Sequence, residues 1–150
     1  MRIKFFLIFS VGFLLFQACT HSPRFTQKRW GNIQPSVPVD EIKYKNYSPV
    51  ETVTGVASYY ADKFHGRITS NGEVYNMYGI TAAHPTYPHE SIIRVTNLSN
   101  GKSVVVRVND RMPYRPDRII DLSYGSAKEL GMLKDGLAEV KLEILEWGEE

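Results

Sequence analysis

Two runs of β-forming residues joined by an Asn-Gly pair constrain the fold of this chain most. Residues 91–98 (SIIRVTNL) and 102–108 (KSVVVRV) are rich in β-branched side chains, and Asn100-Gly101 lies between them. Asn-Gly favours a tight turn between antiparallel strands, because both residues tolerate positive φ. The pattern therefore predicts a β-hairpin.

The same sequence pattern continues from residue 52 onward, where short β-prone runs alternate with turns that contain glycine or asparagine. Further strands are expected at residues 53–60, 78–83, 118–121 and 138–147. One short helix is expected after Ser123, which can cap its first turn, and Gly131 can end it. About 95 residues suffice for one hydrophobic core, so a small β-barrel or sandwich is predicted.

The N-terminus has the layout of an export signal at residues 1–18. Arg2 and Lys4 precede an apolar run at residues 5–16, and a small residue stands before Cys19. Such a run forms about 18 Å of helix, which is too short for the roughly 30 Å hydrocarbon core of a bilayer. We therefore expect a cleaved signal peptide. The alternative is a buried core helix.

Cys19 is the one cysteine of the chain, so an internal disulfide is excluded. Its place after the signal resembles the lipidated first residue of mature bacterial lipoproteins, and Thr20 behind it implies the outer membrane, facing the periplasm. Simple secretion is the alternative. Residues 19–50 are polar and contain four of the eight prolines, which predicts a flexible tether behind the lipid anchor.

The charge balance gives no indication of a nucleic-acid partner. The chain carries 18 Lys and Arg and 16 Asp and Glu, a formal net charge of +2. Loss of Arg2 and Lys4 with the signal leaves 16 basic side chains, which equals the number of acidic ones. No stripe of basic residues is present either, so nucleic-acid binding is not expected.

Polar and ionisable residues concentrate in turns between the expected strands, at residues 65–77, 81–84, 108–114 and 118–123. A rigid β-scaffold can present such side chains to a ligand. Cleavage of a glycosidic bond needs a protonated carboxyl and usually a second carboxylate or an internal nucleophile. Glu73, Asp110 and Asp121 are the candidates. Each also has a structural explanation. Glu73 can be a solvated turn residue, and Asp110 can be a turn residue paired with Arg111. Asp121 can be a buried hydrogen-bonding partner or part of the helix start.

In this order, the segments resemble the rare lipoprotein A family, RlpA. The matching motifs are GVASYY at 55–60, FHGR at 64–67, TSNGE at 69–73, TAAH at 81–84, VTNL at 95–98, VNDR at 108–111 and IIDLS at 119–123. The resemblance implies a mainly β fold over residues 51–148, a six-stranded double-psi β-barrel with one or two short helices.

The resemblance also implies a lyase of the cell wall, an endolytic peptidoglycan lytic transglycosylase. Such an enzyme cleaves the bond between N-acetylmuramic acid (MurNAc) and N-acetylglucosamine (GlcNAc) in glycan strands without stem peptides, and leaves 1,6-anhydroMurNAc ends. The catalytic carboxylates of the family match Glu73 and Asp110. One of them must act as the acid, and we favour Asp110.

Five further residues are candidates for supporting or substrate-binding roles: His84, Asp121, Arg111, Tyr59 and Tyr114. His84 can orient Asp110, bind a sugar hydroxyl or be purely structural. Asp121 matches an Asp-Leu strand end that bears the acid in other double-psi barrels, and a structural role is the alternative. The two tyrosines can stack on sugar rings, although aromatic residues of small barrels more often belong to the core.

A metal or other cofactor is not expected. His65, His84 and His89 have spacings that match no usual zinc ligand set, and no cysteine or carboxylate accompanies them. The expected partners are peptidoglycan glycan strands and, through the anchor, a membrane. Nothing in the sequence indicates a partner at the division site.

Two features depart from the family pattern. Met112 stands where glycine usually follows the Asp-Arg pair, and a side chain there can reshape the cleft beside Asp110. The SPOR domain of many relatives is expected to be absent, since the sequence ends at Glu150. These departures keep open a second function class, a non-catalytic peptidoglycan-binding envelope lipoprotein on the same barrel.

Overall fold

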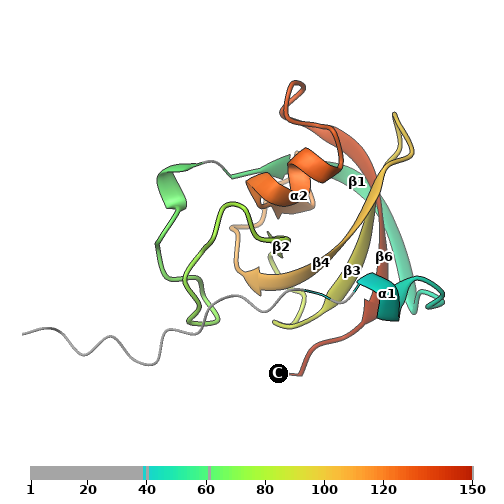
Figure 1. Cartoon of the computed structure of the whole chain (residues 1–150), viewed down its shortest axis with the longest axis horizontal. Helices are drawn as coiled ribbons and strands as arrows, with labels where there is room; N and C mark the ends of the chain where they lie inside the picture. The colour runs from blue at the N-terminus through green and yellow to red at the C-terminus, as the bar shows by residue number, and fades with distance from the viewer. Residues whose placement is uncertain (1–38, 40, 61, 150) are drawn as a thin grey trace, which may run out of the picture. The chain divides into compact units, whose positions relative to one another are not determined.

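Figure 1 shows a computed structural model of the chain, which describes residue 39 and residues 41–60 and 62–149. The predicted signal peptide, Cys19 and most of the predicted tether lie outside the described residues. Among the described residues, no helix is long and apolar enough to cross a membrane.

Six strands close into a barrel in the order β1-β5-β2-β4-β3-β6. They are β1 Glu51–Tyr59, β2 Thr81–Ala83, β3 Ile92–Asn97, β4 Ser103–Asp110, β5 Ile120–Leu122 and β6 Ala138–Glu146. The pairs β1–β5 and β2–β4 are parallel, and the other neighbours are antiparallel. The described helices are α1 Glu41–Tyr44, α2 Tyr124–Glu129 and the 3-10 turn η1 Asp62–Phe64. The predicted mainly β barrel of six strands is confirmed.

The predicted hairpin and helix are both present. Strands β3 and β4 pair antiparallel, and Gly101 adopts φ 70° in the turn between them. At the start of α2, Ser123 Oγ accepts a hydrogen bond from Ser126 N at 3.1 Å, as expected of an N-cap. Gly131 follows the helix with φ 67°, a conformation that glycine adopts without steric cost.

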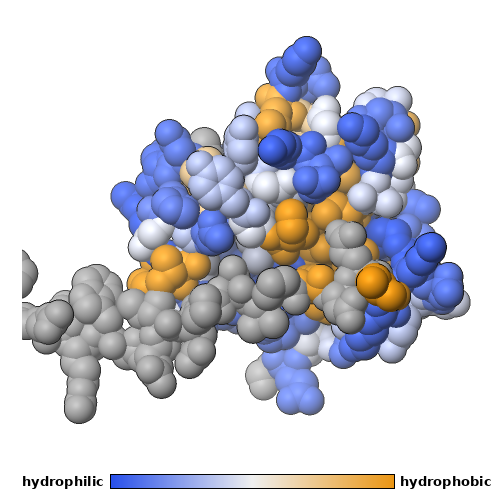
Figure 2. Space-filling model, in the orientation of Figure 1, coloured by the Kyte–Doolittle hydropathy of each residue, from blue (hydrophilic) through white to orange (hydrophobic). Residues whose placement is uncertain are grey.

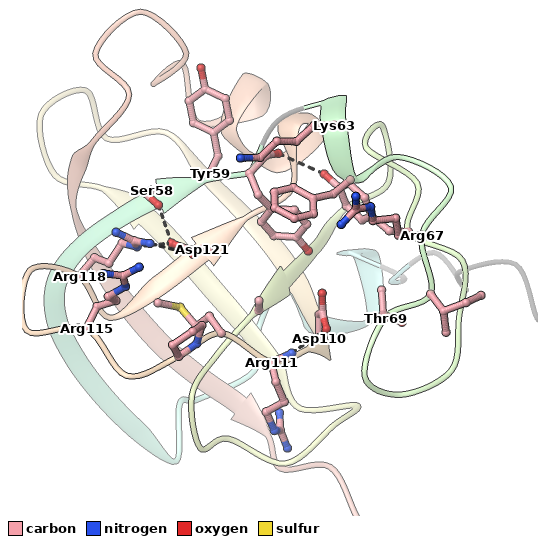
Figure 3. Close-up of a pocket in the computed structure, with 17 residues that line it drawn as sticks. Ser58, Tyr59, Lys63, Arg67, Thr69, Asp110, Arg111, Arg115, Arg118 and Asp121 are labelled. Carbon is pink, nitrogen blue, oxygen red and sulfur yellow. Dashed lines mark hydrogen bonds and ion pairs between the residues drawn. The ribbon is translucent and has the colours of Figure 1, made fainter.

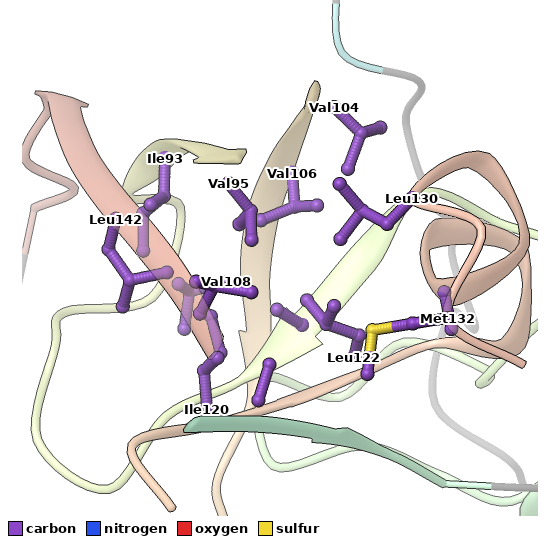
Figure 4. Packing of buried hydrophobic residues seen from close by; sticks show 14 residues of the cluster. Ile93, Val95, Val104, Val106, Val108, Ile120, Leu122, Leu130, Met132 and Leu142 are labelled. Carbon is purple, nitrogen blue, oxygen red and sulfur yellow. The ribbon is translucent and has the colours of Figure 1, made fainter. Parts of the chain in front are cut away.

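The barrel interior is filled by side chains that alternate along the strands (Figure 4). Val95 on β3, Val106 and Val108 on β4, Leu122 on β5 and Leu142 on β6 are fully buried in one cluster. Each such side chain contributes about 1.5–3 kcal/mol by leaving water, so this cluster holds the strands together.

A second cluster covers part of the outside of the barrel and includes a residue of the predicted tether. Tyr44 of α1 is 5% exposed and packs with Ile92, Val105 and Leu145, which belong to β3, β4 and β6. Its hydroxyl donates to Glu146 Oε2 at 2.7 Å. Part of the segment before residue 51 therefore packs on the barrel, because β4 is buried on both faces and α1 covers part of the outer one. On the face in Figure 2, hydrophobic residues gather toward the middle and hydrophilic ones surround them.

Candidate active site

A cleft of about 650 Å³ opens beside the ends of β1 and β4 (Figure 3). Ser58 and Tyr59 end β1, Asp110 ends β4, and Asp121 lies on β5. Two loops complete the walls, residues 63–69 before β2 and residues 111–118 before β5. Two of the three candidate carboxylates, Asp110 and Asp121, thus line one cavity.

Asp110 is held by main-chain donors and keeps one oxygen available. Its Oδ1 accepts from Ser70 N at 2.9 Å and from Arg111 N at 2.8 Å. Within residues 41–60 and 62–149, no hydrogen bond reaches its Oδ2 and no cation pairs with its carboxylate. The expected structural pairing with Arg111 is therefore a backbone contact. The two main-chain donors fix the carboxyl, and Oδ2 is free to meet a ligand in the cleft.

Asp121 is committed to neighbouring side chains instead. Its Oδ1 lies 2.7 Å from Arg118 Nε and accepts from Ser58 Oγ at 2.5 Å. Figure 3 shows the three side chains together on one side of the cleft. Arg118 Nη2 also donates to Asp121 Oδ2 at 3.5 Å, so both carboxylate oxygens have partners. This geometry fits the structural alternative for Asp121.

Glu73 lies behind the cleft wall, in the turn that precedes β2. It is 8% exposed, and its Oε2 accepts from Arg107 Nη2 at 2.8 Å and from Asn109 Nδ2 at 2.9 Å. Burial alone would raise the pKa of this carboxyl, but the hydrogen bonds from Arg107 and Asn109 outweigh it and lower the pKa below its usual value. The Glu73 carboxyl is therefore held in its ionised form.

A β-bulge at the end of β4 brings the Glu73 turn and Asp110 together. Ala82 and Ala83 of β2 pair with Val108 and Asp110, so Asn109 is the extra residue. Asn109 O accepts from Asn71 N at 3.4 Å, while its side chain binds Glu73. Two motifs that are 36 residues apart thus meet through consecutive residues, Asn109 and Asp110.

Arg107 links Glu73 to another carboxylate that sequence reasoning did not single out. Its Nη1 lies 2.6 Å from Glu90 Oε1, and its Nη2 binds Glu73. Glu90 has φ 67° and is the one non-glycine with positive φ in the described part of the chain. A buried arginine inside the apolar run of residues 104–108 was the available signal, since a charge there requires a partner.

His84 is buried, and its side chain accepts hydrogen bonds from the main chain. Its Nδ1 accepts from Thr86 N at 3.2 Å and Tyr87 N at 2.9 Å, and its ring stacks on Tyr87 at 3.5 Å. Burial, aided by Arg111, lowers the pKa of His84 to about 4. The imidazole is therefore neutral at pH 7 with Nδ1 unprotonated. Its backbone N–H donates to Asp110 O at 3.3 Å, so His84 supports the end of β4.

The remaining candidates divide between the cleft and its surroundings. Arg111 and Tyr59 line the cleft, and Tyr59 also packs against the core. Tyr114 is 81% exposed and is not among the lining residues. Met112 is buried and lines the cleft without a positive φ, so methionine is unstrained at this position. Among the described residues, no three His, Cys, Asp or Glu side chains are grouped as a metal site would require.

Comparison with known proteins assigns the chain to a family. The sequence model described as "Lytic transglycolase" matches residues 52–142. The endolytic peptidoglycan transglycosylase RlpA of Pseudomonas aeruginosa (strain UCBPP-PA14) is 55% identical over 104 residues. The chain belongs to the RlpA family. The protein of the same name from Vibrio cholerae is 55% identical over 94 residues, which are 63% of this chain and 36% of that protein.

This RlpA-family chain spans only part of the length of its relatives. The aligned region covers 66% of the chain and 30% of the Pseudomonas aeruginosa protein. Among solved structures, the Streptomyces papain inhibitor matches with a TM-score of 0.53 at 22% identity, over 67% of this chain and 99% of that one. At this identity the likeness supports the fold alone, a double-psi β-barrel, as the family resemblance implied.

Proposed function

We propose that this chain is an endolytic peptidoglycan lytic transglycosylase with Asp110 and Glu73 as its catalytic carboxylates. The substrate would be glycan strands without stem peptides, and the products would carry 1,6-anhydroMurNAc ends. Relatives that are about half identical carry the name endolytic peptidoglycan transglycosylase. The single observation that carries the proposal is the state of Asp110, which lines the cleft with Oδ2 unbound within residues 41–60 and 62–149.

The two carboxylates would have different roles because their surroundings differ. Glu73 is bound to Arg107 and has a lowered pKa, so it is unsuited to donate a proton. Asp110 has main-chain donors on Oδ1, which leaves Oδ2 to carry a proton toward the bridging oxygen. A general acid must lie within hydrogen-bond reach of that oxygen, and Asp110 is the cleft carboxyl with an oxygen that no residue of 41–60 and 62–149 binds.

The proposed reaction consumes no water, because a hydroxyl of the substrate itself is the nucleophile. Asp110 donates its proton to the oxygen that links MurNAc C1 to GlcNAc, and the C1–O bond breaks with its electron pair on the leaving oxygen. The MurNAc C6 hydroxyl attacks C1, closes the 1,6-anhydro ring and returns its proton to the Asp110 carboxylate. Glu73, ionised behind the cleft wall, would stabilise the positive charge that develops at C1.

A digest of purified glycan tests this function. The whole chain, kept in detergent, is incubated with amidase-treated sacculi, and anhydroMurNAc ends are counted by mass spectrometry. We expect Asp110→Asn and Glu73→Gln each to lower the rate by at least about 100-fold, as loss of a general acid or a charge-stabilising group does. Asp117→Asn, an exposed carboxylate on the same loop, is the matched control. Absence of anhydro ends with the unmodified chain would rule the enzyme out.

The second candidate is a non-catalytic peptidoglycan-binding lipoprotein. It is favoured by the burial of Glu73, which is not among the residues that line the cleft. In that case sacculi would retain the protein but release no anhydro ends, and Asp110→Asn would leave the retained amount unchanged.

We also propose that the chain is exported, loses residues 1–18 and is anchored through a lipidated Cys19 to the outer membrane, facing the periplasm. The sequence pattern of residues 1–19 supports this. Mass spectrometry of the mature N-terminus is the test. A lipid-modified Cys19 is expected at the mature N-terminus, and Cys19→Ser should move the protein from the membrane fraction to the soluble one.

A further inference from the structure

The cleft is strongly cationic although the chain as a whole is nearly balanced in charge. Basic side chains that line it are Lys63, Arg67, Arg111, Arg115 and Arg118, and acidic ones are Asp110 and Asp121. The excess of three positive charges in one cavity contrasts with a formal net charge of +2 for all 150 residues. Such a cavity attracts an anionic ligand.

Not all of these cations are equally available. Arg118 is bound to Asp121 and Asp117. The guanidinium groups of Arg111 and Arg115, both exposed, have no hydrogen bond or ion pair within residues 41–60 and 62–149. These two side chains therefore have donors to offer a ligand.

The position of Arg115 also indicates that its guanidinium is available to an anion. Arg115 and Arg118 are partners in an isolated antiparallel bridge, and Figure 3 shows their side chains on the same side of the cleft. Like charges directly opposite each other are destabilising by themselves. Arg118 has carboxylate partners in Asp117 and Asp121, so an anion bound beside Arg115 would supply the partner that Arg115 lacks among residues 41–60 and 62–149.

We infer that Arg111 and Arg115, which have no ion pair within residues 41–60 and 62–149, recognise the free lactyl carboxylate of muramic acid. The inference rests on the proposed function. Each muramic acid carries a lactyl ether, whose carboxyl is a neutral amide when a stem peptide is attached and a charged carboxylate when the peptide is absent. Arginine binds carboxylates through paired, charge-assisted hydrogen bonds. The site would thus select strands without peptides by their charge.

The position of Arg111 fits the chemistry of the bond to be cleaved. The lactyl group sits on C3 of the same muramic ring whose C1 must meet Asp110. Arg111 follows Asp110 directly and lines the same cleft, so a muramic ring whose C1 meets Asp110 would lie beside the loop of residues 111–118. Recognition and cleavage would act on one sugar.

Binding of matched glycans tests the inference. Peptide-free strands are prepared in two forms, with free lactyl carboxylates and with the same carboxyls converted to methylamides. Their Kd for the whole chain is measured by calorimetry at 50 and 300 mM salt. We expect the carboxylate form to bind at least about tenfold more tightly at low salt, because a lost charge-assisted hydrogen bond costs about a factor of ten. The preference should shrink at high salt.

Three variants test which residues cause the preference for the carboxylate form of the glycan. Arg111→Gln and Arg115→Gln should each reduce it several-fold, and Lys134→Gln, an exposed cation outside the cleft, should preserve it. Thermal unfolding confirms that each variant folds. Equal affinity for the two glycans, or a preference that survives both arginine substitutions, would overturn the inference. Binding is measured on chains that also carry Asp110→Asn, which the proposed function makes inactive, and anhydro ends are counted in separate digests with Asp110 intact, so failure of the inference and failure of the proposed function are distinguishable.

Discussion

Arg107 Nη2 lies 2.8 Å from Glu73 Oε2, and both side chains are nearly buried. The pair joins β4 to the turn before β2, 34 residues earlier in the chain. A buried ion pair holds its geometry because separating the charges leaves one of them without solvent or partner. The Arg107–Glu73 contact therefore fixes the turn that carries one predicted catalytic residue.

Removal of Arg107 alone should be costly. Arg107→Met leaves the Glu73 carboxylate buried without its cation, and we expect the free energy of unfolding at pH 7 to fall by about 3–5 kcal/mol. The double variant Arg107→Met/Glu73→Gln should recover much of this loss. Urea unfolding measures both. A double variant no more stable than Arg107→Met would show that the ion pair is not the cause.

Glu90 offers a test of backbone strain. Its φ of 67° is unfavourable for a residue with a side chain, by about 1–2 kcal/mol, while its half-exposed ion pair with Arg107 contributes about 1 kcal/mol or less. Both Glu90→Ala and Glu90→Gly lose the ion pair, but only glycine relieves the strain. We expect the glycine variant to be more stable than the alanine variant by about 1 kcal/mol in urea unfolding. The reverse order would contradict the strained conformation.

His84 should make stability fall on acidification. Its pKa is about 4 in the folded protein against an ordinary 6.5, so the unfolded chain binds the proton first as the pH drops. The free energy of unfolding should therefore decline between pH 6.5 and 4, by about 3 kcal/mol at most from this group. Urea unfolding across this range measures the slope.

The matched control for His84 is the exposed His65, whose Nδ1 accepts a hydrogen bond from Met77 N. His84→Gln should flatten the pH dependence, although its stability at pH 7 should be lower because two backbone N–H groups lose their acceptor. His65→Gln should keep the slope. An unchanged slope in His84→Gln would mean that other groups cause it.

Tyr44 should stabilise the barrel although it precedes the first strand. Tyr44→Ala removes a 5% exposed ring from the outer cluster, and we expect a loss of about 3–5 kcal/mol. Tyr44→Phe keeps the ring and loses the hydrogen bonds of the hydroxyl with Glu146 and Lys43, so about 1 kcal/mol is expected. Thermal unfolding compares them. Equal effects would mean that the hydroxyl, and not the ring, secures α1.

Much of the fold could be predicted because its signals are local. The runs on either side of Asn100-Gly101 alternate β-branched residues around a turn, and they form β3 and β4. Ser123 caps α2 and Gly131 follows it, as expected. The packing of Tyr44 on the barrel was harder to predict, because this tyrosine lies in a polar, proline-bearing segment with no apolar period.

The sequence by itself determined the strands, the capped helix and the set of motifs that identify the family, since each depends on residues close together in the chain. Only the tertiary structure decided how the three carboxylates differ. Asp121 meets Ser58 across the parallel β1–β5 pair, Glu73 meets Arg107, and Asp110 is left facing the cleft. The physical reason is that barrel closure and the bulge at Asn109 set the register, and the register selects each partner.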